Sequence, residues 1–216
     1  MKILSLSLIA ALALLTGCAY NGTLKSGFYS PPATNSRLPL KANLVCGGFF
    51  QSTIIDSGHI YGDYSAHIKT NPALQDAITK SCQMLFNEVY VSAVTDPNNR
   101  LGADIVILPS VQFNEQHLTL TLTVKSAGSG EVIQQYSASD NLQSHAPAGV
   151  HVLDTLDIFA CGGLAPIIIP SNTSMIGHRA EDDLGTCLSF CLGQIVENIS
   201  NDPSLVTKAR AIHKIM

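Results

Sequence analysis

The sequence predicts an α/β fold, more specifically α+β, in one domain. We expect a mainly antiparallel sheet of about four or five strands, with the helices packed on one face. Leucine and threonine alternate strictly between residues 118 and 124, which is typical of a strand with one buried face. Apolar residues recur every three or four positions in two other segments, as in helices with one buried side.

Turn-forming residues lie between or within the segments that we expect to be strands. Gly128 and Gly130 separate two apolar segments, which indicates a hairpin. Gly47 and Gly48 weaken the first strand or mark a bulge in it. In chain order we expect strands at 44–50, 89–94 and 105–108 and a hairpin over 118–138, with a loop over 51–69 and a turn at 96–99.

Two main helices are expected. Asn71-Pro72 is a typical helix start, and Leu74, Ile78, Cys82 and Leu85 follow as one buried stripe. The second helix spans 179–200, where Asp182-Asp183 would form a negatively charged first turn. A shorter helix is expected at 150–159. Another short helix, capped by Asp202-Pro203, is expected to run through Arg210.

The N-terminal segment carries a targeting motif. An apolar run from Ile3 to Leu15 follows Lys2 and ends in Leu15-Thr16-Gly17-Cys18. This motif resembles the lipobox of bacterial lipoproteins, and the resemblance implies that Cys18 is lipidated after cleavage before it. Ala19 follows the cysteine, which by analogy with enterobacterial lipoproteins favours the outer membrane, with the domain facing the periplasm. An ordinary secretory peptide cleaved after Ala19 is the alternative.

These features define three expected regions. Residues 1–17 form the signal peptide, 18–41 form an acylated N-terminus with a flexible tether, and 42–216 form a periplasmic α/β domain. Sixteen acidic against twelve basic side chains give a net charge of −4, and no basic patch is visible. This composition argues against a nucleic-acid partner.

The remaining cysteines allow two interpretations. In an oxidising compartment, Cys46, Cys82, Cys161, Cys187 and Cys191 are possible disulfide cysteines. Cys187 and Cys191 lie four residues apart on one helix, with Cβ atoms roughly 5–6 Å apart. A disulfide requires about 3.8 Å, so each is better placed to pair elsewhere, with Cys161 as one candidate. Alternatively, several are buried free thiols.

The sequence offers no catalytic or metal-ligating motif. Zinc sites usually contain closely spaced Cys or His pairs such as Cys-x₂-Cys, and no such spacing occurs. There is no Gly-x-Ser-x-Gly nucleophile elbow, and Ser129 between two glycines fits a turn. We therefore expect no catalytic residues, no metal and no cofactor.

One apolar segment stands out. Pro166, Ile167, Ile168, Ile169 and Pro170 follow a Gly-Gly break, and the prolines argue against a helix interior. The segment is interpreted either as an exposed loop that contacts a partner or a membrane, or as a buried edge strand, which we favour.

The mature region also resembles, in its order of elements, the small α/β lipoproteins of the Gram-negative envelope. That resemblance implies a non-enzymatic interaction or structural accessory, held at the membrane by its N-terminal lipid and bound to an envelope protein. The alternative is a binding module for a small apolar or lipid ligand between sheet and helices. A hydrolytic or redox enzyme is the third interpretation.

Overall fold

The computed structural model describes residues 19–32, 37–47, 54–56, 65–95, 101–114, 117–142 and 165–213. Cys18, Cys161, the expected turn at 96–99 and the expected helix at 150–159 lie outside these ranges. The elements are β1 (Ala19–Thr23), β2 (Leu38–Val45), β3 (Ile54–Asp56), β4 (Ser65–Lys69), α3 (Ala73–Leu85), β5 (Phe86–Ser92), β6 (Ile105–Asn114), β7 (His117–Ser126), β8 (Val132–Asn141), α6 (Ala165–Ser200) and α7 (Ser204–His213).

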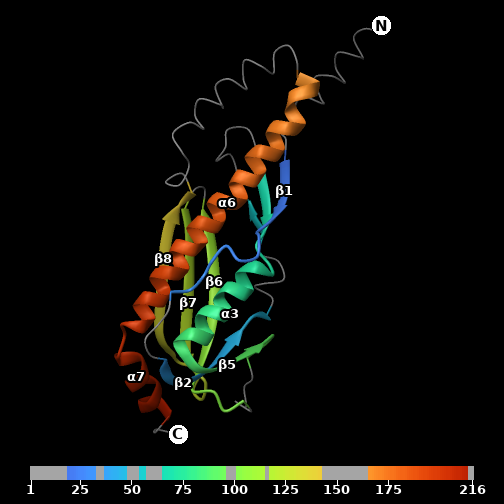
Figure 1. Cartoon of the computed structure of the whole chain (residues 1–216). Helices are drawn as coiled ribbons and strands as arrows, with labels where there is room; N and C mark the ends of the chain where they lie inside the picture. The colour runs from blue at the N-terminus through green and yellow to red at the C-terminus, as the bar shows by residue number, and fades with distance from the viewer. Residues whose placement is uncertain are drawn as a thin grey trace.

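The predicted α/β fold is confirmed. Five strands form one sheet in the order β5-β2-β6-β7-β8 (Figure 1). Strands β6, β7 and β8 form the expected antiparallel meander, whereas β2 pairs in parallel with both β5 and β6. The sheet is therefore mixed, because the chain crosses over through α3 before β5 and places β6 on the other side of β2.

The threonine alternation of β7 separates the two faces of the sheet. Leu118, Leu120 and Leu122 are at most 1% exposed and point into the core. The threonines between them face the opposite side, where Thr119 and Thr121 exchange hydrogen bonds with serines of β8 at 2.8 and 2.6 Å. The hydroxyl groups of these pairs on the second face therefore satisfy one another's hydrogen bonds.

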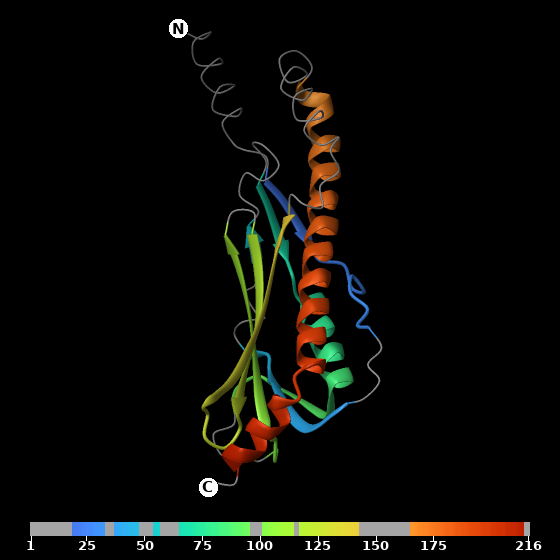
Figure 2. The same cartoon turned by 90° about the vertical axis from the view of Figure 1, so that its left-hand side faces the viewer.

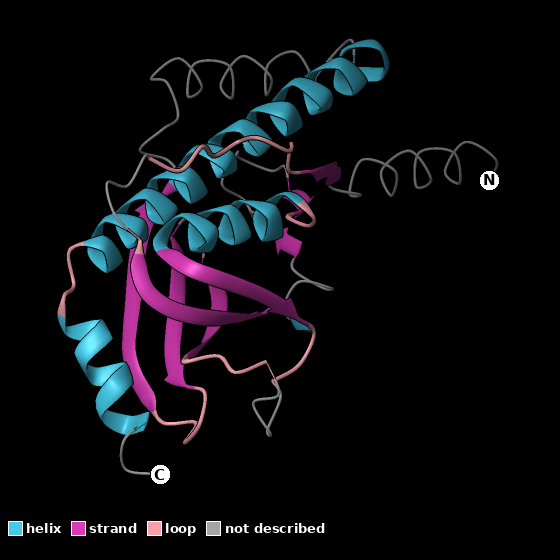
Figure 3. Ribbon diagram, turned by 60° about the horizontal axis from the view of Figure 1, so that its bottom comes forward, coloured by secondary structure: helices cyan, strands magenta, loops and turns pink. Residues whose placement is uncertain are grey.

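Both long helices lie on the apolar face of the sheet. Figure 2 shows α3 and α6 on one side of the five strands, and Figure 3 shows the same two layers from a different direction. Buried side chains from the sheet, α3, α6 and α7 form one continuous core cluster. The space between the layers is thus occupied by packed side chains.

The expected stripe of α3 is confirmed, since Leu74, Ile78, Cys82 and Leu85 are all buried. The helix begins at Ala73, one residue later than expected, so Pro72 is its N-cap residue and not its first helical residue. At the C-terminal end, Asp202 precedes α7 as predicted, and its carboxylate accepts a hydrogen bond of 2.9 Å from the Ser204 N–H.

Helix α6 corrects two expectations. It begins at Ala165, so Pro166 to Pro170 belong to its first turns and form neither a loop nor an edge strand. Pro166 is compatible with that position because a first helical turn does not need its N–H groups for intrahelical bonds. Asp182-Asp183 consequently lie in the middle of the helix, not in a first turn, and Asp183 is buried.

In the segment expected to be a tether, the described residues 19–32 and 37–41 are instead part of the folded domain. Ala19–Thr23 is strand β1, which pairs in parallel with β4, and β4 pairs antiparallel with β3. Residues 54–56 and 65–69 of the loop expected over residues 51–69 are likewise strands, β3 and β4. After β1, residues 24–32 run along the side of the helices away from the large sheet, and we call this segment the strap (Figure 2). Leu24 and Tyr29 of the strap belong to the core cluster.

Candidate functional site: a groove between the strap and helix α6

A groove lies where the strap meets α6, on the outer side of the helix layer. Its volume is about 650 Å³, within the range of small-ligand or peptide sites. It is lined by residues 24–28 of the strap and by Glu181, Asp182, Gly185, Thr186, Ser189 and Phe190 of α6. Because these positions recur every three or four residues, one outward-facing stripe of α6 forms its floor.

Two glycines allow the strap to approach the helix. Gly27 adopts a φ of +83°, which glycine tolerates without strain, and turns the chain at the groove. A Cβ atom placed on Gly185 would lie 3.4 Å from the Cβ of Phe28 and 3.6 Å from Cδ1 of Leu24. Phe28 and Leu24 thus pack directly against the helix at Gly185, and a side chain larger than that of alanine would need the space that they occupy.

A buried carboxylate attaches the end of β1 to α6. Glu181 is only 5% exposed, and its Oε1 accepts a hydrogen bond of 3.0 Å from the backbone N–H of Thr23. The Leu24 N–H donates to the Lys69 carbonyl at 2.8 Å. The strap is thus positioned by hydrogen bonds to both α6 and β4, which argues against a freely moving segment.

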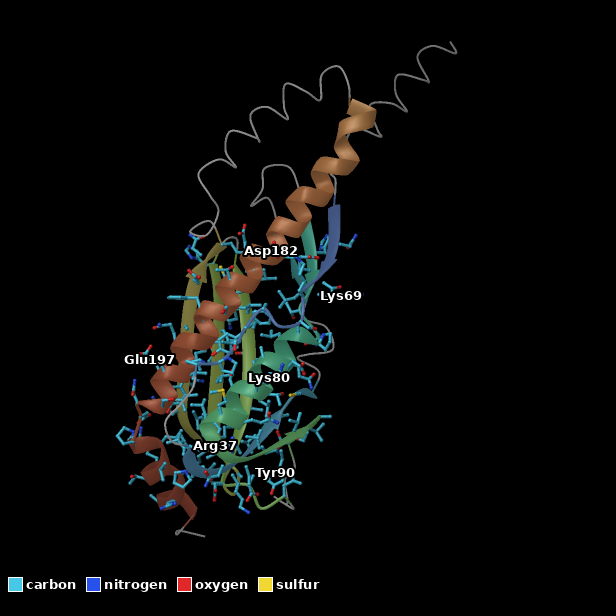
Figure 4. All side chains as sticks on the ribbon, in the orientation of Figure 1. Arg37, Lys69, Lys80, Tyr90, Asp182 and Glu197 are labelled. Carbon is cyan, nitrogen blue, oxygen red and sulfur yellow. The ribbon has the colours of Figure 1, made fainter. Side chains whose placement is uncertain are left out.

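The rim of the groove carries an exposed ion pair. Lys25 Nζ lies 3.0 Å from Asp182 Oδ1, and both side chains are more than half exposed. The hydrogen bond and charge of Asp182 raise the pKa of Lys25. Figure 4 labels Asp182 toward the end of the molecule that carries β1, with Arg37 and Tyr90 toward the other end. Exposed pairs contribute little stability, so Lys25 and Asp182 are available to a ligand.

The groove also presents aromatic surface. Phe190 is 48% exposed, one of few large apolar side chains so exposed among the described residues. Phe28 is half-buried against the core on the facing strap. Aromatic side chains flanked by charges are typical centres of protein–protein contacts. The arrangement can bind an apolar side chain of a partner and orient it through the rim.

The described cysteines are buried free thiols. Cys46, Cys82, Cys187 and Cys191 form no disulfide, which supports the second interpretation of the sequence for these four. Burial raises the pKa of Cys82 to about 12 and that of Cys191 to about 11. Burial, reinforced by the nearby Asp140 carboxylate, also raises the pKa of Cys187. These thiols stay protonated near neutral pH and are poor nucleophiles.

The described ranges contain neither a metal-binding cluster nor a membrane-spanning helix. There, no three His, Cys, Asp or Glu side chains gather as a metal ion would require. Within the same ranges, none of the helices combines the length and apolarity needed to cross a membrane.

No protein-family model matches this sequence, and the search of curated proteins finds no match. Among solved structures, the chain is similar to the crystal structure of a Xanthomonas campestris protein assigned to the family DUF330. The superposition covers 91% of this chain and 98% of that one, at 9% sequence identity and a TM-score of 0.43.

Sequence reasoning missed the groove entirely. Its strap was interpreted as a tether because of its polar and glycine-containing composition. The only local signal is Gly185, which costs an interior helical position about 1 kcal/mol relative to alanine. Gly193 of the same helix carries the same signal, but a Cβ there would have no neighbour within 4 Å in the described part of the chain. A glycine in the sequence therefore does not by itself locate the strap.

Proposed function

We propose that this protein is a membrane-anchored envelope lipoprotein that acts as a non-enzymatic interaction accessory. In this proposal Cys18 carries the lipid, the domain faces the periplasm from the outer membrane, and the groove binds a segment of an envelope protein. The observation that carries the accessory role is the groove itself, which exposed Phe190 and half-buried Phe28 line together with Gly185.

The chemistry of the groove favours a peptide segment with one large apolar side chain. Phe28 and Phe190 offer an apolar contact, and Lys25 and Asp182 offer one charge of each sign at the rim. A partner side chain that displaces the solvent around the aromatic rings would gain most of the binding free energy there. The charges of the rim would set its orientation.

In-cell crosslinking tests the binding role. A photo-crosslinking amino acid is placed at Thr186, an exposed position of the groove, and at Ser139 on the polar face of the sheet as the control. We expect an adduct of defined protein mass from position 186, lost when Phe190→Ser is added, and none from position 139. Adducts that are the same at both positions would contradict the proposal.

The same experiment separates the alternative function. A small apolar or lipid ligand would use this groove as well, because the layer between sheet and helices is occupied by the core cluster. Such a ligand would give an adduct of a few hundred daltons at position 186 instead of a protein. Anchoring is tested separately by the mass of the N-terminal peptide, which should carry a diacylglyceryl thioether on Cys18. An unmodified Cys18 would contradict the anchor.

A further inference from the structure

The structure relates the proposed anchor to the apolar beginning of α6. Strand β1 begins at Ala19, the residue directly after Cys18, and it contacts α6. Figure 1 shows β1 and the first turns of α6 at the same end of the molecule, with the helix extending beyond the strand. A lipid on Cys18 would therefore bring that end of α6 to the membrane.

The hydrogen bond between Thr23 and Glu181 shows which residues of β1 and α6 lie side by side. From it we can work out how far α6 extends beyond Ala19, the residue next to the proposed anchor. Both elements run away from this end of the molecule (Figure 1). Ala19 is four residues before Thr23, about 13 Å along a strand. The same distance on a helix corresponds to about nine residues, which places Ala19 beside position 172. Ala165 then lies about 10 Å beyond Ala19.

The segment that extends beyond the anchor level is apolar and uncharged. Residues 165–177 contain three consecutive isoleucines and no Asp, Glu, Lys or Arg, and the first such residue is Arg179. Helices that lie in a membrane surface are buried by about 5–10 Å at the boundary between headgroups and acyl chains. Helix α6 would enter end-on and not lie flat, and it extends beyond Ala19 by a comparable distance, so its first turns would reach that boundary.

We propose that the first turns of α6, around Ile167, Ile168 and Ile169, insert into the lipid surface to which Cys18 is anchored. This inference rests on the proposed lipid anchor. It gives the domain a second attachment point, and two points define an orientation that one flexible lipid group does not. The groove, which involves α6 from Glu181 onward, stays outside the lipid.

A tryptophan reporter tests this, because the chain contains no tryptophan. Ile167→Trp, Ile168→Trp and Ile169→Trp are made separately in the mature lipoprotein. Each is reconstituted into vesicles of phosphatidylethanolamine and phosphatidylglycerol with brominated acyl chains. Val132→Trp is the matched control, since Val132 is 54% exposed at the start of β8. The three positions differ by about 100° around the helix, so a variant that misfolds leaves two others.

We expect at least a two-fold loss of emission, with a shift to shorter wavelength, for one or more of the isoleucine positions. The Val132→Trp emission should not change. Emission that is unaffected at all three positions, in protein whose Cys18 is lipidated by mass, would overturn the inference and leave the anchor intact. A bare Cys18 would instead overturn the anchor, and the inference with it.

Discussion

The position of the strap can be tested with two glycines of one helix. Gly185 and Gly193 both lie in α6, eight residues apart. A Cβ atom on Gly193 would have no heavy-atom neighbour within 4 Å in the described part of the chain, whereas one on Gly185 would touch Phe28 and Leu24. The same substitution therefore meets open space at one position and the strap at the other.

The expected magnitudes follow from these distances. Replacing an interior helical glycine by alanine or leucine gains up to about 1 kcal/mol of helix propensity. Gly193→Ala and Gly193→Leu should both show this gain. Gly185→Ala should gain about as much, because its Cβ would lie 3.4 and 3.6 Å from Phe28 and Leu24, which are ordinary van der Waals contacts. Gly185→Leu needs the space that Phe28 occupies, and overpacking of this kind costs about 1–3 kcal/mol.

Urea denaturation followed by far-ultraviolet circular dichroism measures the difference. Slopes of about 1–3 kcal/mol per molar are typical for domains of this size, so the two leucine variants should differ by roughly 1 M in midpoint. Gly193→Leu is the control for helix propensity and for added apolar surface. Equal midpoints for Gly185→Leu and Gly193→Leu would refute the packing of the strap on α6, and the groove with it.

Three further predictions concern other parts of the domain. Hydrogen bonds from Ser204, and from Tyr136, lower the pKa of the Asp202 carboxyl group in the folded protein. The ionised carboxylate therefore stabilises the folded state above the unfolded pKa near 3.8. This contribution is lost as the pH falls through the lower folded pKa. Asp202→Asn should flatten the dependence of the urea midpoint on pH below about 4, and an unchanged acid slope would count against this. Gly47→Ala should cost about 1–3 kcal/mol in thermal denaturation, because its Cβ would overlap the Ala93 carbonyl oxygen; a wild-type melting temperature would contradict that contact. Cys82 should resist maleimide at pH 8 when folded and react in urea, as peptide mass mapping would show; rapid labelling of the folded protein would contradict its burial.

The sequence predicted the elements whose local pattern and tertiary environment agree. The alternation of apolar and polar residues in β7 and the apolar stripe of α3 each indicate an element with one buried face. Both elements do have their apolar face in the core. Asp202 was recognised as a cap because its side chain acts within two residues of itself. Parallel pairing of β2 with β5 and β6 left no comparable local pattern, since it depends on a crossover over many residues.

The missed elements are those in which tertiary packing overrides local preference. Two prolines argued against a helix at 166–170, yet α6 begins there and continues for 36 residues. Strand β1 and the strap have the composition of a linker, but Leu24 and Tyr29 contribute to the core and Glu181 binds the Thr23 N–H. A single buried carboxylate and the burial of two side chains position this segment, and neither is a sequence pattern.

The strap also limits which partners the groove can reach. Leu24 and Phe28 lie six and ten residues after Cys18, and an extended residue spans at most about 3.5 Å, so the groove is within about 20–35 Å of a lipid on Cys18. A flexible coil of the same region would move through a comparable radius in every direction. Pairing of β1 with β4 removes that freedom, because the chain between anchor and groove is hydrogen-bonded into the domain. If Cys18 carries the proposed lipid, a partner segment would have to approach close to the membrane and in one orientation, which would favour a protein that is itself held at that surface.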